Sequence, residues 1–193
     1  MLPPTAFNEG PPATPRPSAT VLLVRDGDPW EVLMVQRPGG ADFAPGAYVF
    51  PGGAVSDEDR GSDDELRAAA VRELFEEAGI VIEQDALAMF ARWITPAQLR
   101  RRFDTRFYLA LMPEGQSVRP QQGEIVNWLW LAPREALRRA DITLVYATRA
   151  VLESVADAPD SASLFARARA LREVPVVEPR IVQTPDGWRI VRD

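Results

Sequence analysis

The sequence predicts an α+β fold, in which helices surround a mixed sheet, and three observations lead to this prediction. β-branched apolar runs come first, one well-terminated helix follows in the middle, and strand-like runs return after it. This order of elements is typical of sheets that are covered by helices. The 193 residues are enough for one domain with an additional segment, and the hydrophobic share of 46% is enough for a globular core.

The N-terminal part predicts a hairpin and a short third strand. Residues 1–18 are rich in proline, and we expect them to form a flexible or polyproline segment. The apolar runs 19–25 and 31–37 are separated by the turn sequence at 26–29, which favours a β-hairpin. A further apolar run, 47–50, lies within a stretch that is rich in glycine and proline.

The centre of the chain predicts a helix over 68–78. Strong helix formers run through it, and Gly79 follows as a residue that commonly ends helices. Ala69, Leu74 and Ile80 give this helix an apolar side that can pack on a sheet. The later elements are expected to be two strands, three helices and a hairpin, at 105–112, 125–131, 133–140, 143–156, 162–171 and about 184–187.

The composition excludes several kinds of chemistry. The chain has no cysteine and no histidine, and all 22 of its basic residues are arginine. Disulfides, thiolate nucleophiles, Schiff bases and a P-loop lysine are therefore excluded. Any acid–base chemistry must use aspartate, glutamate, tyrosine or a metal-bound water.

The net charge of −6 comes from one segment, 56–77, which holds nine acidic residues and three arginines. Such a segment indicates either a cation site or an exposed acidic loop. The acidic balance argues against a nucleic-acid surface. No apolar run reaches the length of a membrane span, and no secretory signal is present at the N-terminus, so we expect a cytoplasmic protein without membrane contact.

Three glutamates mark the central helix as the candidate site. Glu73, Glu76 and Glu77 stand at i, i+3 and i+4, which places their carboxylates on one helix face. Like charges at this spacing destabilise a helix, whereas a hard cation such as Mg²⁺ is bound by carboxylate oxygens. Arg72 precedes Glu76 by four residues and could hold its side chain in place. The alternative is an exposed acidic face without a ligand.

The glycines before this helix complete a known pattern. Phe-Pro-Gly-Gly at 50–53, followed by Arg-Glu-Leu-Phe-Glu-Glu-Ala-Gly-Ile at 72–80, resembles the Nudix hydrolase family. The second half of that family's box is matched at every specified position. The first half departs from it, because 18 residues separate the last glycine from the arginine, five more than in the box. Asp59 and Asp64 take the spacing of the box glutamate, counted from either end.

The resemblance implies a Nudix-type α/β/α sandwich with a mixed sheet, in which the catalytic helix follows the Gly-Gly loop. It covers 19–158 as a domain, and we expect 159–193 to form a helix and hairpin that pack on it or extend it. It also implies an enzyme that hydrolyses the pyrophosphate bond of a nucleoside diphosphate linked to another group, with Mg²⁺ or Mn²⁺ as cofactor. The inserted residues, 56–65, are expected to form an exposed loop, so that deletion of 59–63 leaves the metal site intact.

The resemblance also assigns roles by position. Glu76 and Glu77 match the glutamates that bind metal, and Glu73 matches the one that binds metal or handles the proton. Arg72 matches the arginine that orients a glutamate. The carbonyl group of Gly53 corresponds to a backbone metal ligand.

Further site residues are expected outside the helix. Glu124 follows Gln121-Gln122-Gly123 and resembles a second metal-binding or basic glutamate of the family, with an ordinary turn carboxylate as the alternative. Arg102 and Arg106 lie in the densest positive stretch and would face the same side of an extended segment, where they could bind phosphate. If that stretch is only a solvated loop, Arg37 is the next candidate for the phosphate contact.

A second resemblance, to one branch of the family, concerns the substrate. The long box insertion, together with 49–53, 100–107 and 123–126, resembles the coenzyme A diphosphatase-like branch of organellar Nudix proteins and their bacterial relatives. This branch implies coenzyme A or acyl-CoA as substrate, and ADP-ribose, nucleotide sugars and dinucleotides are alternatives. A non-catalytic nucleotide-binding sensor module is the alternative of another class, and we also expect that the chain can form a homodimer.

Four aromatic residues are candidates for base stacking or for the core, namely Phe43, Trp93, Trp128 and Trp130.

Overall fold

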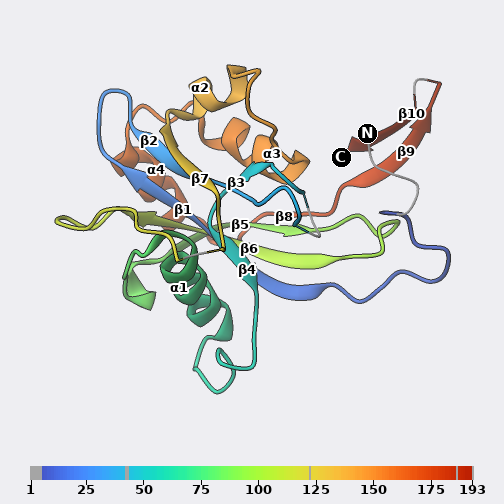
Figure 1. The fold of residues 1–193 in the computed structure, drawn as a ribbon, viewed down its shortest axis with the longest axis horizontal. Coiled ribbons are helices and arrows are strands. Elements are labelled where there is room, and N and C mark those ends of the chain that lie inside the picture. The colour runs from blue at the N-terminus through green and yellow to red at the C-terminus, as the bar shows by residue number, and fades with distance from the viewer. Residues whose placement is uncertain (1–5, 42–43, 122, 186, 193) are drawn as a thin grey trace.

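A computed structural model describes residues 6–41, 44–121, 123–185 and 187–192 of the chain (Figure 1). In chain order the strands are β1 (Arg16–Arg25), β2 (Glu31–Gln36), β3 (Tyr48–Val49), β4 (Gly52–Ala54), β5 (Ala88–Ile94), β6 (Phe103–Leu111), β7 (Asn127–Leu131), β8 (Val176–Val177), β9 (Arg180–Thr184) and β10 (Gly187–Val191). The helices are α1 (Glu65–Ala78), α2 (Pro133–Arg138), α3 (Tyr146–Val155) and α4 (Ser161–Arg169), and a 3-10 turn, η2, covers Gln84–Ala86.

The main sheet is mixed and runs in the order β3-β2-β1-β6-β5-β8, with β4 paired to β1 and β7 paired to β2. β1 runs parallel to β6, and β5 runs parallel to β8, whereas the other pairs of this sheet are antiparallel. α1 covers one face of the sheet, and α2, α3 and α4 lie on the other (Figure 1). The predicted α/β/α sandwich with a mixed sheet is therefore confirmed.

Alternation along β1 divides the core into two layers. Val21 and Leu23 pack toward α1, together with Leu74 of that helix. Leu22 and Val24 point to the opposite face, where α3 and α4 supply their apolar sides. All four strand side chains are fully buried, as expected for a central strand that is covered on both faces.

The predicted N-terminal hairpin forms, but its first strand begins earlier than expected. β1 starts at Arg16, so the end of the proline-rich segment belongs to the sheet. This extension has a long-range cause, because Arg16 and Pro17 pair in parallel with Phe103 and Asp104 of β6. Farther toward the N-terminus, Phe7 forms an isolated bridge with Leu99, and residues 1–5 of this predicted segment lie outside the described part of the chain.

The predicted central helix is confirmed, with three additional residues at its start. Asp64 caps α1, since its side chain accepts a hydrogen bond of 3.1 Å from the backbone N–H of Arg67. Gly79 ends the helix in the left-handed conformation, with φ of 68°, and its N–H bonds to Phe75 O. A Cβ atom at this glycine would overlap the carbonyl oxygen of Arg119, so both backbone conformation and space favour glycine.

The C-terminal part both joins the sandwich and extends beside it. α4 packs in the core layer opposite α1, and β8 pairs with β5. β9 and β10 form a separate antiparallel ribbon, as the predicted hairpin requires, although its turn residue Asp186 lies outside the described residues. The ribbon meets the N-terminal segment where the rings of Phe7 and Trp188 approach to 5.1 Å. None of the helices in the described part of the chain has the length and apolar character needed to cross a bilayer.

Candidate active site

The Gly-Gly strand lies directly against the acidic face of α1. β4 pairs with the start of β1, and this register brings Gly52 and Gly53 beside the helix. The N–H of Gly52 donates a hydrogen bond of 2.9 Å to Glu77 Oε2. A Cβ atom at Gly53 would overlap the carboxylate of Glu73. The two glycines therefore let the backbone approach two glutamates more closely than residues with a side chain would allow.

Arg72 links the glutamates of α1 to each other. Its Nη1 donates to Glu73 Oε1 at 2.9 Å and to Glu76 Oε2 at 2.8 Å. Its Nη2 donates to the carbonyl oxygen of Ala54, which lies just beyond the glycines, at 3.1 Å. The contact with Glu76 is the one that the i, i+4 spacing indicated. One guanidinium thus fixes two of the helix carboxylates relative to the strand.

Asp59 completes this network from the inserted loop. Its carboxylate accepts two hydrogen bonds from Arg72, at 3.1 and 3.0 Å, and its side chain is only 3% exposed. Ser56 donates to the same carboxylate through its backbone N–H and its hydroxyl. Burial raises the pKa of Asp59, but the hydrogen bonds from Arg72 and Ser56 outweigh burial and lower it below the ordinary value.

The inserted loop is therefore not the uniformly exposed excursion that the sequence predicted. Asp57, Glu58 and Arg60 are exposed as expected, but Asp59 between them is buried. Deletion of 59–63 would remove the partner of Arg72, so the structure gives no support to the expectation that this deletion leaves the metal site intact. Asp64, the other candidate for the box position, instead caps the helix.

Two of the glutamates are held in an environment that disfavours their negative charge. Glu77 is 5% exposed, and burial raises its pKa to about 8 despite the hydrogen bond from Gly52. Burial likewise raises the pKa of Glu73, although the charge of Arg72 opposes the shift. The charge of Glu124 raises both values further, and Arg37 lowers that of Glu77. Glu124 and Arg37 therefore lie near enough to act electrostatically on the site, and their predicted roles stay predictions.

The donor atoms suit a divalent cation, although they form no ready-made cage. Within the described residues, no three acidic side chains converge closely enough to hold a metal ion by themselves. Arg72 binds Glu73 and Glu76, and the Gly52 N–H binds Glu77. Mg²⁺ needs few protein carboxylates, since it keeps several waters and takes oxygens from substrate phosphates. A cation would also offset the burial and mutual repulsion of Glu73 and Glu77. The residues present therefore fit such an ion.

Comparison with known proteins identifies the family of this site. A model of the NUDIX domain matches residues 14–151, which include β4, the inserted loop and α1. The chain belongs to the NUDIX domain family. This confirms the family resemblance that the glycines and glutamates indicated.

Individual NUDIX relatives support the same assignment. "Putative nudix hydrolase 7" of Caenorhabditis elegans is 33% identical over 158 residues, which cover 64% of this chain and 54% of that protein. The chain thus spans about half the length of this relative. A solved NUDIX hydrolase from Alicyclobacillus acidocaldarius superimposes with a TM-score of 0.71 at 26% identity, and the match covers 80% of this chain and 96% of that one.

The NUDIX fold also appears in a more distant structure. The NUDIX domain of Shewanella oneidensis NrtR, solved in complex with ADP ribose, superimposes with a TM-score of 0.59 at 21% identity. The match covers 74% of this chain and 87% of that one. At this identity the likeness concerns the fold alone.

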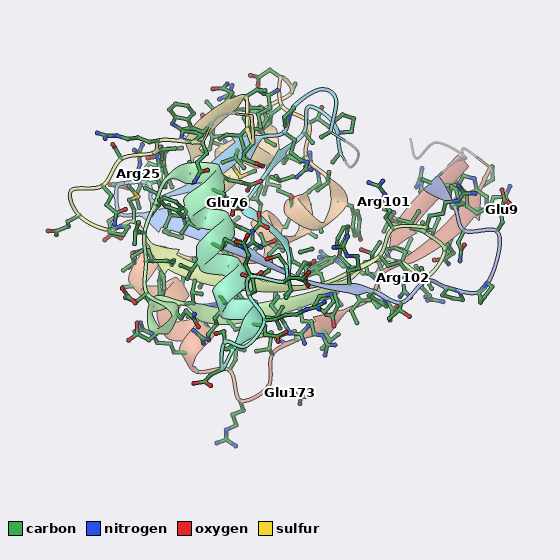
Figure 2. All side chains as sticks on the ribbon, turned by 60° about the horizontal axis from the view of Figure 1, so that its bottom comes forward. Glu9, Arg25, Glu76, Arg101, Arg102 and Glu173 are labelled. Carbon is green, nitrogen blue, oxygen red and sulfur yellow. The ribbon has the colours of Figure 1, made fainter. Side chains whose placement is uncertain are left out.

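The arginine stretch before β6 lies away from the NUDIX site. Figure 2 shows Arg101 and Arg102 in the extended arm of the molecule, far from Glu76 on α1. The Arg102 side chain is 8% exposed and donates to Thr95 O at 3.0 Å, Ala13 O at 2.8 Å and Glu178 Oε1 at 2.6 Å. The prediction that Arg102 binds substrate is therefore wrong, because its guanidinium joins three parts of the chain.

Arg106 is placed differently. It lies on the α1-facing side of β6, where residues of the same alternation pack under the helix, and it pairs in register with Ala19 of β1. Its Nη1 contacts Asp104 Oδ1 at 2.5 Å. Asp104 also accepts two hydrogen bonds from Arg92, at 2.8 and 2.7 Å, so its charge is shared by two guanidinium groups. The predicted contact of Arg106 with phosphate stays a prediction.

The aromatic candidates separate into core and surface residues. Trp93 is buried in the core layer opposite α1. Trp130 packs against the layer beneath α1, and the guanidinium of Arg25 lies 4.6 Å from the centre of its ring. Trp128 is 41% exposed. Phe43 lies outside the described residues.

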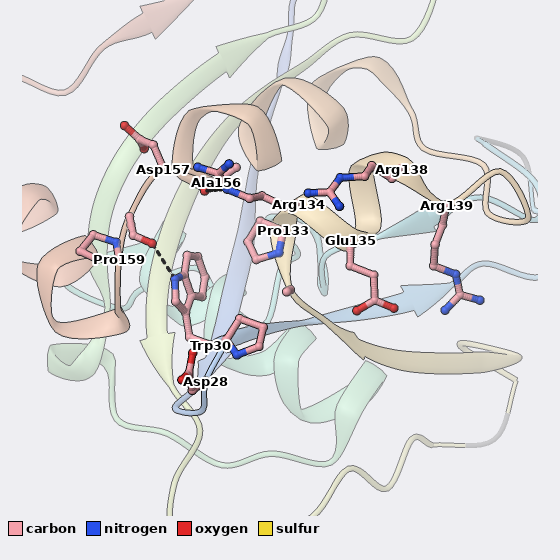
Figure 3. Close-up of a pocket in the computed structure, with 13 residues that line it drawn as sticks. Asp28, Trp30, Pro133, Arg134, Glu135, Arg138, Arg139, Ala156, Asp157 and Pro159 are labelled. Atoms are coloured by element: carbon pink, nitrogen blue, oxygen red, sulfur yellow. Dashed lines mark hydrogen bonds between the residues drawn. The ribbon is translucent and has the colours of Figure 1, made fainter.

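A cavity of about 590 Å³ lies elsewhere in the molecule (Figure 3). It is formed by the turn between β1 and β2, the start of α2 and the connection between α3 and α4, and the indole N–H of Trp30 within it donates to Ala158 O at 2.9 Å. No residue predicted for the NUDIX site lines this cavity. The residues of the predicted NUDIX site lie on β4 and α1 and around them instead.

Proposed function

We propose that this NUDIX chain is a metal-dependent hydrolase that cleaves the pyrophosphate bond of a nucleoside diphosphate linked to another group. One observation carries the proposal: Glu73, Glu76 and Glu77 share one helix face, and two of them, Glu73 and Glu77, lie against the Gly52–Gly53 backbone. A binding module would not need to keep all three carboxylates in place. The hydrolase names of the C. elegans relative and the A. acidocaldarius structure support the same activity.

The cation site is proposed to consist of the carboxylates of Glu73, Glu76 and Glu77, the carbonyl group of Gly53 and the carboxylate of Glu124. When bound, Mg²⁺ or Mn²⁺ would neutralise phosphate charge and lower the pKa of a nearby water. The remaining work falls to the chain itself. Arg72 keeps two glutamates oriented, and the N–H of Gly52 fixes the third.

Hydrolysis also requires a base and a group that positions the phosphates. Water attacks one phosphorus atom, the bond from this atom to the bridging oxygen breaks, and two phosphorylated products leave. We assign the proton from water to Glu124, because it is exposed and its charge acts on both Glu73 and Glu77. Glu73, the other candidate, is already held by Arg72. Arg37, which lies close enough to lower the pKa of Glu77, is proposed to face the phosphates.

Coenzyme A or an acyl-CoA is the substrate that the sequence resemblance favours, on account of the long box insertion and the motifs around it. ADP-ribose, nucleotide sugars and dinucleotides contain the same reacting bond. The NrtR NUDIX domain, which was solved with ADP ribose, indicates that this fold can accommodate an adenine nucleotide. All of these compounds therefore belong in one substrate test.

The test is a screen of the purified chain with Mg²⁺ or Mn²⁺ against coenzyme A, an acyl-CoA, ADP-ribose, a nucleotide sugar and a dinucleotide. We expect one or more to yield two phosphorylated products by chromatography, and 4-nitrophenyl phosphate, which has no pyrophosphate bond, to stay intact. EDTA should stop the reaction. Binding of a nucleotide without turnover in either metal would contradict the hydrolase and favour the sensor module.

A further inference from the structure

Two large apolar side chains are exposed on β7 at the border of the proposed active site. Val126, the residue before the strand, is 61% exposed, and Trp128 on the strand is 41% exposed. Most apolar side chains of the main sheet are buried in one of the two core layers. Single exposed apolar side chains are common on protein surfaces, so the position of these two beside the proposed site, rather than their exposure alone, points to a ligand.

The register of β7 shows which face of the sheet carries these side chains. Trp128 pairs with Val35 of β2, and Val35 is buried in the layer beneath α1. Asn127 points to the opposite face, where its Nδ2 donates to the Tyr48 hydroxyl at 2.9 Å. Because side chains alternate along a strand, Val126 and Trp128 face the same side as the acidic helix.

The same segment is continuous with the active site. The chain that leads into β7 is bound to the end of α1, since Gln121 N–H donates to Glu76 O at 3.1 Å. It then passes through Glu124, whose charge acts on Glu73 and Glu77. The N–H of Val126 then donates to the carbonyl oxygen of Gln36, which ends β2 and directly precedes Arg37. Val126 and Trp128 therefore extend the surface that holds the proposed phosphate-binding groups.

We propose that Trp128 is the stacking platform for the nucleobase of the substrate, with Val126 beside it, while the diphosphate lies at the glutamates of α1. This rests on the proposed function and names the half of the substrate that the chain recognises. An indole ring presents a flat apolar face on which any nucleobase can stack. Trp128 is exposed beside the proposed site and provides such a face. Trp130 cannot serve in the same way, because Arg25 already covers its ring.

The first test measures kcat and KM for the best substrate of the screen. Trp128→Ala should raise KM about tenfold, with the effect falling mainly on KM, as expected for loss of base–aromatic stacking. Trp128→Phe keeps an aromatic face and should recover most of the affinity. Trp188→Ala is the matched control, because Trp188 is similarly exposed, at 47%, but lies on β10. Equal KM values for wild type and Trp128→Ala would overturn the proposal.

A second test separates this inference from the hydrolase activity. AMP and ribose 5-phosphate are titrated against the wild-type chain and the variants, with binding followed by calorimetry. We expect Trp128→Ala to weaken the binding of AMP about tenfold and to leave ribose 5-phosphate, which has no base, unaffected. If no substrate is cleaved but AMP binding still depends on Trp128, the proposed function fails and the stacking platform stands. If AMP binds wild type and Trp128→Ala equally, the platform is refuted whatever the activity.

Folding of the variants is checked by circular dichroism. Should Trp128→Ala not fold, Trp128→Leu keeps an apolar side chain without an aromatic face. In Trp128→Leu, AMP affinity equal to that of the wild type would overturn the proposal, and a loss of affinity that Trp128→Phe restores would support it.

Discussion

Asp59→Ala tests whether the inserted loop is part of the active site. The carboxylate accepts two hydrogen bonds from Arg72 and two from Ser56, and it is almost fully buried. Its removal leaves the Arg72 guanidinium without the acceptor of two of its hydrogen bonds. We therefore expect both lower stability and lower activity, although Asp59 is not one of the proposed metal ligands.

The size of the stability loss follows from the burial of the pair. Breaking a buried ion pair by removing one partner costs about 3–5 kcal/mol. The Arg72 side chain is 19% exposed and keeps Glu73, Glu76 and Ala54 O as acceptors, so the lower end, about 3 kcal/mol, applies. With a urea dependence of about 2 kcal/mol per M, the unfolding midpoint should fall by about 1.5 M. Misplaced glutamates should also lower kcat by about 100-fold.

Urea unfolding followed by circular dichroism measures the first effect, and steady-state kinetics measures the second. Asp57→Ala is the matched control, because Asp57 lies two residues away and forms a solvent-exposed pair with Arg60. Its unfolding free energy should change by no more than about 0.5 kcal/mol. Equal unfolding midpoints for the Asp59 and Asp57 variants would refute the role of Asp59 as the anchor of Arg72.

Three further predictions concern neighbouring residues. Folded Glu77 keeps its proton up to about pH 8, whereas the unfolded chain releases it near pH 4.5, so the unfolding free energy in EDTA should fall as pH rises between these values. Urea titrations at pH 5 and pH 8 should show a smaller fall for Glu77→Gln, and identical falls would contradict the raised pKa. Arg102→Ala should lower the unfolding midpoint and leave KM within about twofold, because its guanidinium joins parts of the fold; a tenfold rise in KM with unchanged stability would restore a phosphate role. Gly53→Ala should lower kcat by about 100-fold by displacing Glu73, whereas Gly39→Ala, which adds a Cβ into open space, should not; equal kcat values would refute the need for close approach.

Local patterns predicted the features of the fold that depend on neighbouring residues. The hairpin was marked by its turn sequence, and the acidic helix by its periodicity and by the glycine at its end. The glutamates share a face for the same local reason. β5 was missed, because Ala88–Ile94 has no regular alternation and contains a register shift between Met89 and Ala91. Strands of this kind are defined by their partners more than by their own sequence.

Long-range contacts account for the errors at the candidate site. Arg102 was read as a phosphate ligand, but its acceptors, Ala13 and Glu178, come from opposite ends of the chain. Asp59 has the spacing of the box glutamate, and the sequence therefore contained a signal for its role. The five additional residues obscured that signal, because composition alone indicates an exposed acidic loop. Only the fold shows that this loop turns one carboxylate inward.

The carboxylates of α1 are proposed to make the chain a metal-dependent pyrophosphohydrolase, and kcat of Glu77→Gln with saturating Mg²⁺ on the best substrate of the screen tests this role. We expect a loss of at least about 100-fold with the fold intact, because a lost ligand removes charge stabilisation at the reacting phosphates. Glu65→Gln, which changes an exposed carboxylate in the first turn of the same helix, should keep wild-type activity. Full activity of Glu77→Gln, or full activity of the wild type in EDTA, would contradict the claim.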